Sequence, residues 1–324
     1  MMLPELLGTV LTNPAGLIAP SFNPTPLLSG ALGDFVDPRT LVTVFVDGLA
    51  KSAIYIMVAI GLTLIFGLLG VLNFAHGSFT MIGAYLGGLI MVVIVGSSPG
   101  LLALAWFFVS VIVVFGVVAG LGVGIEIGLI RSLYDRSPLY QILLTFGITL
   151  VLEELMRIIL LFYGMQPLTD WQEVMGTKPA FLTTSVKVAG FTFDSLSLFQ
   201  IAFGVVTTVL VWTFLTRTRY GLIVRAGSED DEMTEALGID VRRVFTTVFA
   251  IGAGIAGVAG TLLMWDPVWG ASVPLAVETL LPAFVVVIVG GLGTFRGTIV
   301  AGIIVGMVDA TMTWWFQNAI SFTG

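Results

Sequence analysis

The chain alternates between long apolar stretches and short polar segments that are rich in glycine or charge. Most of the apolar stretches approach the roughly 20 residues that a helix needs to cross the hydrocarbon of a bilayer. They cover Val42–Leu72, Ser78–Val95, Leu101–Val123, Pro138–Tyr163, Leu198–Leu215, Phe245–Met264, Val277–Val289 and Thr298–Trp315. The seventh is short for a full crossing and contains Pro282. The pattern predicts an all-α, polytopic membrane protein with about eight transmembrane helices.

The polar segments suggest how the chain is organised. Residues 1–39 contain six prolines and no basic residue before Arg39, so they lack the basic start of a secretory signal. They are expected to form an irregular extension. Residues 40–316 are expected to form the transmembrane domain, with a polar loop at residues 216–244, and residues 317–324 a C-terminal tail. The alternating run Ser185–Phe193 predicts a small hairpin outside the bilayer.

Composition supports a membrane protein and excludes several other classes. Charged residues make up 10% of the chain, whereas a soluble domain carries roughly 25%. The mean hydropathy is +1.07. The absence of cysteine excludes disulfides and cysteine-ligated metals, and a single histidine argues against a histidine-built metal or catalytic centre. No basic stripe is present that would bind nucleic acid.

Basic residues determine the predicted orientation, because cytoplasmic loops of membrane proteins carry an excess of lysine and arginine. If eight spans alternate, one side carries Arg131, Arg136, Arg217, Arg219, Arg225, Arg242, Arg243 and Arg296. The opposite side carries Arg39, Lys178 and Lys187. The first side is therefore assigned to the cytoplasm, and both termini are predicted to be external.

Several features within the spans invite a structural or a functional interpretation. Gly116, Gly120 and Gly124 lie four residues apart, which predicts close packing against another helix. The i, i+4 spacing of Asp47 and Lys51 predicts an ion pair within one helix.

Glu153 and Arg157 have the same spacing, with Glu154 beside them. They can neutralise each other, but an ionisable residue inside a membrane is also a candidate for the transport pathway. Both interpretations of Glu153 stay open.

The segment Asn73–Gly77 separates the first two spans. Asn73 is a suitable N-cap for the second span, and Gly77 permits a tight reversal. One interpretation is a capped turn in which His76 satisfies a backbone carbonyl. The other is a broken helix whose positive end faces a conduction path. Asn73, His76 and Gly77, together with Glu153, are the candidate residues of a substrate pathway.

The most densely charged segment, Thr216–Val244, contains a well-marked short helix. Ser228 is the expected N-cap, acidic residues follow in the first turn, and Gly238 stands where a C-cap is expected. The helix is either an ordinary solvated loop helix or a compact surface for a soluble partner.

Three stretches resemble the branched-chain amino acid permease family of ABC importers. Residues Gly61–Tyr85, GLTLIFGLLGVLNFAHGSFTMIGAY, resemble its signature. Residues Arg225–Val244, RAGSEDDEMTEALGIDVRRV, resemble its cytoplasmic loop, and the glycine-rich GAGIAGVAGTL follows. The turn Gly290–Gly297, GGLGTFRG, is similar to another in the family. These resemblances occur in the same order as in the family and span residues 42 to about 306.

The resemblance implies a permease subunit in the cell (inner, cytoplasmic) membrane. It implies import of branched-chain or related small amino acids by alternating access, driven by separate cytoplasmic ATPases. A second, related permease and an external binding protein complete the implied assembly. The chain has no G-x-x-x-x-G-K-[ST] phosphate loop, so ATP is expected to be used by the partner subunit. The chain is not expected to be an enzyme or to need a cofactor.

The resemblance also points to residues that contact the ATPase. The segment Ala236-Leu237-Gly238, with Glu235 before it, falls where the coupling helix of the family would meet that partner. Arg225 and Glu232 are included in this candidate set. The proline-rich extension and the acidic triplet Asp230–Glu232 depart from the family pattern and leave the identity of the partners open.

Two alternatives remain. One is an ion-coupled secondary transporter or channel that uses Glu153, Glu154 or Asp309 as coupling carboxylates. The other is an ABC permease of the same family for urea or short amides.

Overall fold

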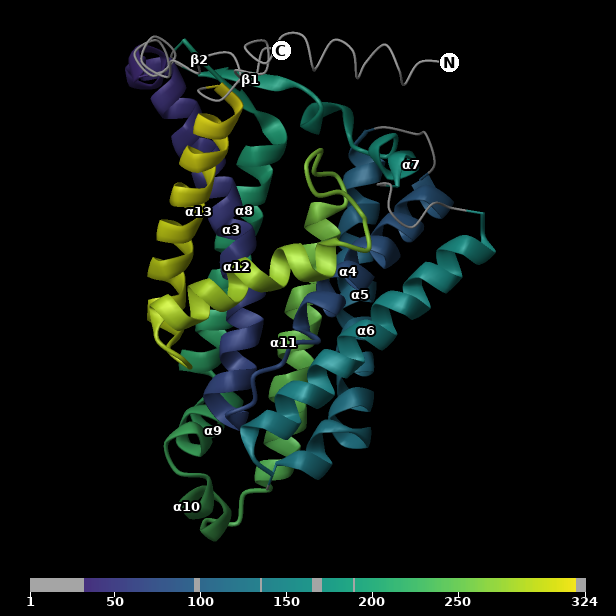
Figure 1. The fold of residues 1–324 in the computed structure, drawn as a ribbon, viewed down its shortest axis with the longest axis vertical. Helices are drawn as coiled ribbons and strands as arrows, with labels where there is room; N and C mark the ends of the chain where they lie inside the picture. Colours follow the sequence, from purple (N-terminus) through teal and green to yellow (C-terminus); the bar gives the residue numbers. More distant parts are fainter. Residues whose placement is uncertain (1–31, 96–99, 135, 165–170, 189, 319–324) are drawn as a thin grey trace, which may run out of the picture.

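The computed structural model describes residues 32–95, 100–134, 136–164, 171–188 and 190–318, and these residues are mainly helical (Figure 1). The long helices are α3 (Pro38–Leu69), α4 (His76–Ile90), α5 (Leu101–Gly128), α6 (Pro138–Phe162), α8 (Ser195–Arg217), α11 (Val241–Leu263), α12 (Leu275–Gly290) and α13 (Phe295–Asn318). The short helices are η2 (Met91–Val95), η3 (Ile130–Leu133), α7 (Gln172–Met175), η4 (Ala180–Leu182), α9 (Arg219–Glu229) and α10 (Asp231–Ala236). The strands β1 (Ser185–Val188) and β2 (Phe191–Asp194) complete the described elements.

The expected fold class is confirmed, with the number of spans only approximate. Six of the described helices are long and apolar enough to cross a membrane: α3, α4 with η2, α5 with η3, α8, α11 and α13. α6 has 25 residues. α12 has only 16 residues and lies across the long axis of the molecule (Figure 1). The predictions for residues 1–31 and 319–324 concern parts of the chain outside the described residues.

The core of the molecule forms around α3, α4 and α11. Four consecutive residues of α3, Met57 to Ile60, have no exposed surface, so the middle of this helix is covered on all sides. The outer helices instead expose large apolar side chains, such as Ile112 of α5 (72%), Leu143 of α6 (69%) and Leu210 of α8 (65%). Such an apolar exterior suits a hydrocarbon environment.

Glycine allows the central helices to approach until their backbones touch. A β-carbon added at Gly260 of α11 would collide with the carbonyl oxygen of Thr80 in α4. One added at Gly83 of α4 would collide with the backbone of Gly257 in α11. Small residues at a helix crossing permit this close packing within membranes.

The prediction that Gly116, Gly120 and Gly124 form a close helix contact is wrong within the described chain. A β-carbon added at any of the three would meet no atom within 4 Å. The face of α5 that contacts α11 instead contains Gly122, whose added β-carbon would lie 2.8 Å from Cβ of Ala253. Sequence spacing identifies a stripe of glycines but not the side on which another helix lies.

The chain breaks between α3 and α4. α3 ends at Leu69, an irregular connection follows, and α4 begins only at His76. In Figure 1 the start of α4 lies in the middle of the molecule, close to α12. Gly77 is in backbone contact with Ala276 of α12, where a β-carbon would collide with the Ala276 carbonyl oxygen. The first turns of α4 and α12 therefore meet inside the protein.

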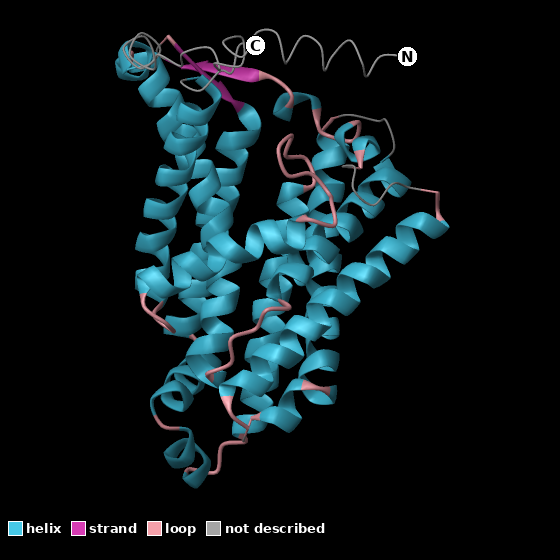
Figure 2. Ribbon diagram, viewed as in Figure 1, coloured by secondary structure: helices cyan, strands magenta, loops and turns pink. Residues whose placement is uncertain are grey.

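The two ends of the molecule carry different polar elements. The predicted hairpin is confirmed as an antiparallel pair with Val186 opposite Phe193, and it lies at one end (Figure 2). α9 and α10 lie at the opposite end. Long helices that run between the two ends separate these polar segments.

The contact between α4 and α11 predicts unequal effects of one substitution at two glycines. Gly260→Ala places a methyl group against a backbone carbonyl that cannot move aside, so we expect a loss of about 1–3 kcal/mol in the free energy of unfolding. The matched control, Gly120→Ala, faces open space and improves helix propensity. Thermal unfolding of the purified variants in detergent measures both effects, and equal midpoints for the two would contradict the assigned packing.

Candidate functional site

The predicted short helix at Ser228–Gly238 is divided into two helices. Thr218 caps α9, since its side-chain oxygen accepts a hydrogen bond from the Gly221 amide at 3.0 Å. Asp230 caps α10 by accepting from the Met233 amide at 2.8 Å. The assignment of Ser228 as N-cap is wrong. It lies inside α9 and donates to the Arg225 carbonyl oxygen, because the extended backbone at Asp230 ends α9 one residue later.

α10 ends at an exposed apolar tip. Gly238 has a φ of 81°, a left-handed conformation that favours glycine, and its amide donates to the Glu235 carbonyl oxygen at 2.8 Å. Just before it, Leu237 is 75% exposed, and Met233 is 60% exposed. Ala236 and Glu235 are exposed as well. We call residues 219–238 the α9–α10 surface; the side chain of Glu232 lies outside the described part.

The α9–α10 surface is attached closely to the membrane helices. Gly221 lies against the last turn of α8, where a β-carbon would collide with the carbonyl oxygens of Phe214 and Leu215. On the same side of α9, Val224 is buried, and Gly227 faces Leu68 at the end of α3. α9 is therefore in direct packing contact with the ends of α3 and α8.

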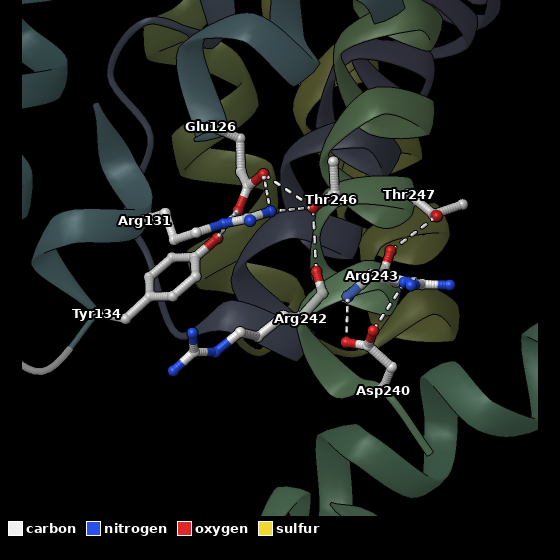
Figure 3. Close-up of polar contacts among 8 residues, drawn as sticks. All are labelled: Glu126, Arg131, Tyr134, Asp240, Arg242, Arg243, Thr246 and Thr247. Atoms are coloured by element: carbon white, nitrogen blue, oxygen red, sulfur yellow. Dashed lines mark hydrogen bonds and ion pairs between the residues drawn. The ribbon is translucent and has the colours of Figure 1, made fainter. Parts of the chain in front are cut away.

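The chain that follows α10 is fixed by a second cap. Asp240 accepts a hydrogen bond from the Arg243 amide at 3.2 Å and forms an ion pair with the Arg243 side chain at 2.7 Å (Figure 3). It thereby begins α11 directly beside the α9–α10 surface. α11 then continues into the core, where it packs on α4.

A buried carboxylate joins α5, η3 and α11 near this end (Figure 3). Glu126 has no exposed surface and accepts hydrogen bonds from Arg131 at 3.1 and 2.9 Å. Tyr134 donates to the same carboxylate at 2.7 Å, and Thr246 donates at 2.9 Å. Four donors therefore surround one buried charge, which makes its burial energetically acceptable.

Tyr134 remains a hydrogen-bond donor in this cluster over the whole physiological pH range. Burial, followed by the hydrogen bond to the Glu126 carboxylate, raises the pKa of the Tyr134 hydroxyl well above its ordinary value. The hydroxyl therefore keeps its proton and continues to donate to Glu126 in this range.

The break before α4 buries polar side chains. Asn73 and His76 have no exposed surface. Asn73 is not the N-cap of α4: that position is Ala75, and the Asn73 side-chain oxygen accepts from the Ala75 amide at 3.1 Å. The His76 Nε2 lies 3.0 Å from the carbonyl oxygen of Val58, so Nε2 carries the proton and donates.

Several buried polar atoms at this break lack a partner among the described residues. They are Asn73 Nδ2, His76 Nδ1, Ser78 Oγ and Thr80 Oγ1. Buried polar groups in proteins are nearly always hydrogen-bonded to protein or to ordered water. The start of α4 therefore offers hydrogen-bonding capacity that the described protein groups do not use.

The predicted ion pair of Asp47 with Lys51 is wrong, and the interpretation that Glu153 pairs with Arg157 is not matched by a salt bridge between them. Lys51 pairs with Asp309 of α13, with Nζ and Oδ2 3.1 Å apart, rather than with Asp47. In α6, Arg157 pairs with Glu154 at 3.8 Å rather than with Glu153.

Lys51 of α3 thus contacts the neighbouring helix α13. Tyr55 of α3 and Thr313 of α13 also donate hydrogen bonds to Asp309. Glu153 is partly buried, and its Oε1 has no hydrogen-bond partner among the described residues.

Comparison with known proteins assigns the chain to a family. Residues 44–323 match the family model of the branched-chain amino acid transport system permease component. The chain belongs to this family. Because the match begins at residue 44, the proline-rich residues 1–39 precede it.

Named relatives of the permease come from bacteria and an archaeon. The high-affinity branched-chain amino acid transport system permease protein LivH of Escherichia coli is 28% identical over 288 residues, covering 85% of this chain and 88% of the relative. BraD of Pseudomonas aeruginosa, a protein with the same description, is 29% identical over 274 residues, covering 82% and 84%. The probable branched-chain amino acid transport permease protein LivH of Methanocaldococcus jannaschii is 28% identical over 272 residues, covering 83% and 80%. No solved structure matches the permease significantly.

Family membership confirms several predictions made from the sequence. The permease is a multi-pass membrane protein and a component of an ABC transport system, not an enzyme. The described residues contain no group of acidic or histidine side chains that could hold a metal ion.

Sequence reasoning missed the Glu126 cluster of the permease. Glu126, Arg131 and Tyr134 lie within nine residues at the end of a predicted span, and this proximity is the signal that could have indicated a local network. Thr246 is 120 residues away, and nothing local in the sequence connects it to Glu126.

The Glu126 cluster predicts a strong effect of removing one charge. Glu126→Gln keeps the shape but turns an amide N–H₂ toward the surrounding donors. We expect a loss of about 1–3 kcal/mol in the free energy of unfolding of the permease. Asp240→Asn is the control, because it removes an exposed ion pair and keeps a good N-cap, so little change is expected. Thermal unfolding in detergent measures both, and an unaffected Glu126→Gln protein would contradict a stabilising role for this cluster.

Proposed function

We propose that the permease is the membrane subunit of an ABC importer for branched-chain or related small amino acids. It moves substrate by alternating access, and a separate ATPase drives this motion. The observation that carries the proposal is the α9–α10 surface. It has an exposed apolar tip at Leu237, and its α9 part packs tightly against the ends of α3 and α8. The family match and the named function of the relatives support the substrate class.

In this proposal the α9–α10 surface docks the ATPase. The docking residues are Arg225, Glu232, Glu235, Ala236, Leu237 and Gly238. Leu237 and Met233 are large apolar side chains exposed on a polar segment, and such side chains commonly anchor protein contacts. The chain has no phosphate loop of its own, so ATP is used by the partner and the permease needs no cofactor.

The orientation follows from the basic residues. Arg217, Arg219 and Arg225 lie in or beside the α9–α10 surface, and the cluster of Figure 3 adds Arg131 and Arg243. Cytoplasmic segments carry such an excess, so this end is assigned to the cytoplasm. The hairpin end is then external, as are both termini, the extension of residues 1–39 and the tail of residues 317–324. The transmembrane domain spans residues 40–316.

The assembly is proposed to contain a second, related permease, cytoplasmic ATPases and an external substrate-binding protein. The relatives named above are permease proteins of transport systems, which supports the need for further subunits.

The substrate pathway is proposed to pass the break before α4. Asn73, His76 and Gly77 lie at or next to the contact between the starts of α4 and α12, and the unpaired polar atoms there would offer hydrogen bonds to a passing polar molecule. Glu153 of α6 is included because its carboxylate has an oxygen without a partner among the described groups. Polar groups at a discontinuous helix commonly form substrate sites in transporters.

An ion-coupled carrier receives less support. Asp309, one of its candidate carboxylates, already binds Lys51 and Tyr55. Uptake by the isolated permease in liposomes under an ion gradient alone would contradict the proposal of ATP-driven transport.

The docking proposal predicts loss of the ATPase when the exposed tip of α10 becomes charged. Leu237→Asp and Ala236→Asp place a carboxylate in the proposed apolar contact, so we expect co-purification of the ATPase to fall at least tenfold. Val268→Asp is the control, since Val268 is equally exposed in the loop that joins α11 and α12. Affinity purification from membranes, scored by the ATPase recovered per permease, measures this. Unchanged recovery with both variants would reject the α10 tip as the docking site.

The pathway proposal predicts slower uptake when the polar groups at the break are removed. Asn73→Ala and His76→Leu should each reduce amino acid uptake by the reconstituted transporter several-fold, while His76→Gln keeps a donor toward Val58 and should retain more activity. Ser110→Ala is the control, because Ser110 is equally buried but bonds only within α5. If Asn73→Ala and His76→Leu leave both uptake and ATP hydrolysis unchanged, the pathway lies elsewhere.

A further inference from the structure

A groove of about 280 Å³ opens between the ends of α3, α8, α9 and α13. Its floor consists of buried aliphatic side chains from three of these helices: Leu64, Leu68, Leu215 and Val224. Its rim is exposed and more polar, with Trp212, Arg225 and Arg296. The groove therefore combines an apolar interior with positive charge at its opening.

The two rim arginines have no acidic partner within the described part of the chain. Arg225 makes only a long hydrogen bond to the Gly221 carbonyl oxygen, at 3.4 Å. By contrast, Arg131, Arg157 and Arg243 each form an ion pair with a nearby carboxylate. The charge at the rim is thus available to an anion that comes from outside the described protein.

The groove is continuous with the surface that faces lipid. Trp212, 43% exposed, lies one turn after Val209 on the same side of α8, and Val209 is 52% exposed. Tryptophan is enriched where membrane helices pass from hydrocarbon to the headgroup region. The place of Trp212 near the C-terminal end of α8 supports assigning the opening of the groove to the depth of the phospholipid headgroups.

We propose that this groove binds an anionic phospholipid. An acyl chain fills the apolar floor, and the phosphodiester lies between the guanidinium groups of Arg225 and Arg296. Arginine matches the geometry of phosphate oxygens, and basic pockets between membrane helices bind anionic headgroups. This assignment concerns a bound lipid and is independent of which substrate is transported.

A lipid explains the groove better than an acidic protein surface does. A protein carboxylate could reach the two arginines, but it would leave the aliphatic floor uncovered. A lipid covers both the floor and the rim, and it bridges α9 to α3, α8 and α13. In this arrangement Arg225 contributes to the proposed docking surface indirectly: it holds lipid against α9, beside the apolar tip of α10 that would contact the ATPase.

The test compares lipid binding by the full-length permease purified in detergent. Native mass spectrometry during titration with phosphatidylglycerol or phosphatidylcholine of the same acyl chains gives the ratio of the two affinities. Two arginines at the headgroup predict a preference for phosphatidylglycerol of roughly 30-fold. The double variant Arg225→Gln/Arg296→Gln should lower this ratio to about 2 or less.

Two further variants distinguish lipid binding in the groove from a general effect of positive charge at this end. Arg217→Gln/Arg219→Gln removes the same charge at the same end and should keep the preference of the unmodified permease. Arg225→Lys/Arg296→Lys keeps the charge and should retain most of it. A ratio near one in the unmodified permease, or equal losses in the two glutamine double variants, would overturn the proposal.

A measurement on the unmodified permease keeps the test independent of variant folding. Photoactivatable phosphatidylglycerol should crosslink to residues of the groove, and unlabelled phosphatidylglycerol should compete at least tenfold better than phosphatidylcholine. Crosslinks confined to other surfaces would refute the site. Equal competition by inorganic phosphate would show a simple anion site instead of a lipid site, and would also refute it.

Discussion

The backbone contact between α4 and α11 is the constraint on which the rest of the permease depends. Because Gly260 lies directly on Thr80 and Gly83 lies on Gly257, the two helices fit only in this register. The register fixes the start of α4 in the middle of the molecule, next to α12. The polar groups of Asn73 and the rest of the break are therefore buried as a consequence of helix packing elsewhere.

At the N-terminal end of α11, polar contacts replace the glycine packing found in the core. Asp240 begins the helix, and Thr246, six residues later, connects it to the buried Glu126. The same helix thus joins the α9–α10 surface to the helix break in the core. This continuity gives the proposed coupling a physical route: a rigid element with one end at the docking surface and the other in contact with α4.

The sequence predicted features that depend on local order and missed those that depend on distant partners. Long apolar stretches identified the membrane helices, and alternation identified the hairpin. Local spacing paired Lys51 with Asp47, whereas the structure pairs it with Asp309, more than 250 residues away. The sequence indicated a capped helix near residue 230 but assigned its N-cap to Ser228, whereas the structure places that cap at Asp230, one of the acidic residues expected in the first turn.

Close packing of α3 has a consequence for how transport proceeds. Gly306 of α13 lies on Ser52, Gly61 of α3 lies on Gly252 of α11, and Gly204 of α8 lies on Ala53. Because α8, α11 and α13 all make such close contacts with α3, none of these helices can slide along it without breaking several contacts at once. In the alternating access proposed above, this packing would make the subunit tilt as one block against the proposed second permease, with the hinge between the two chains.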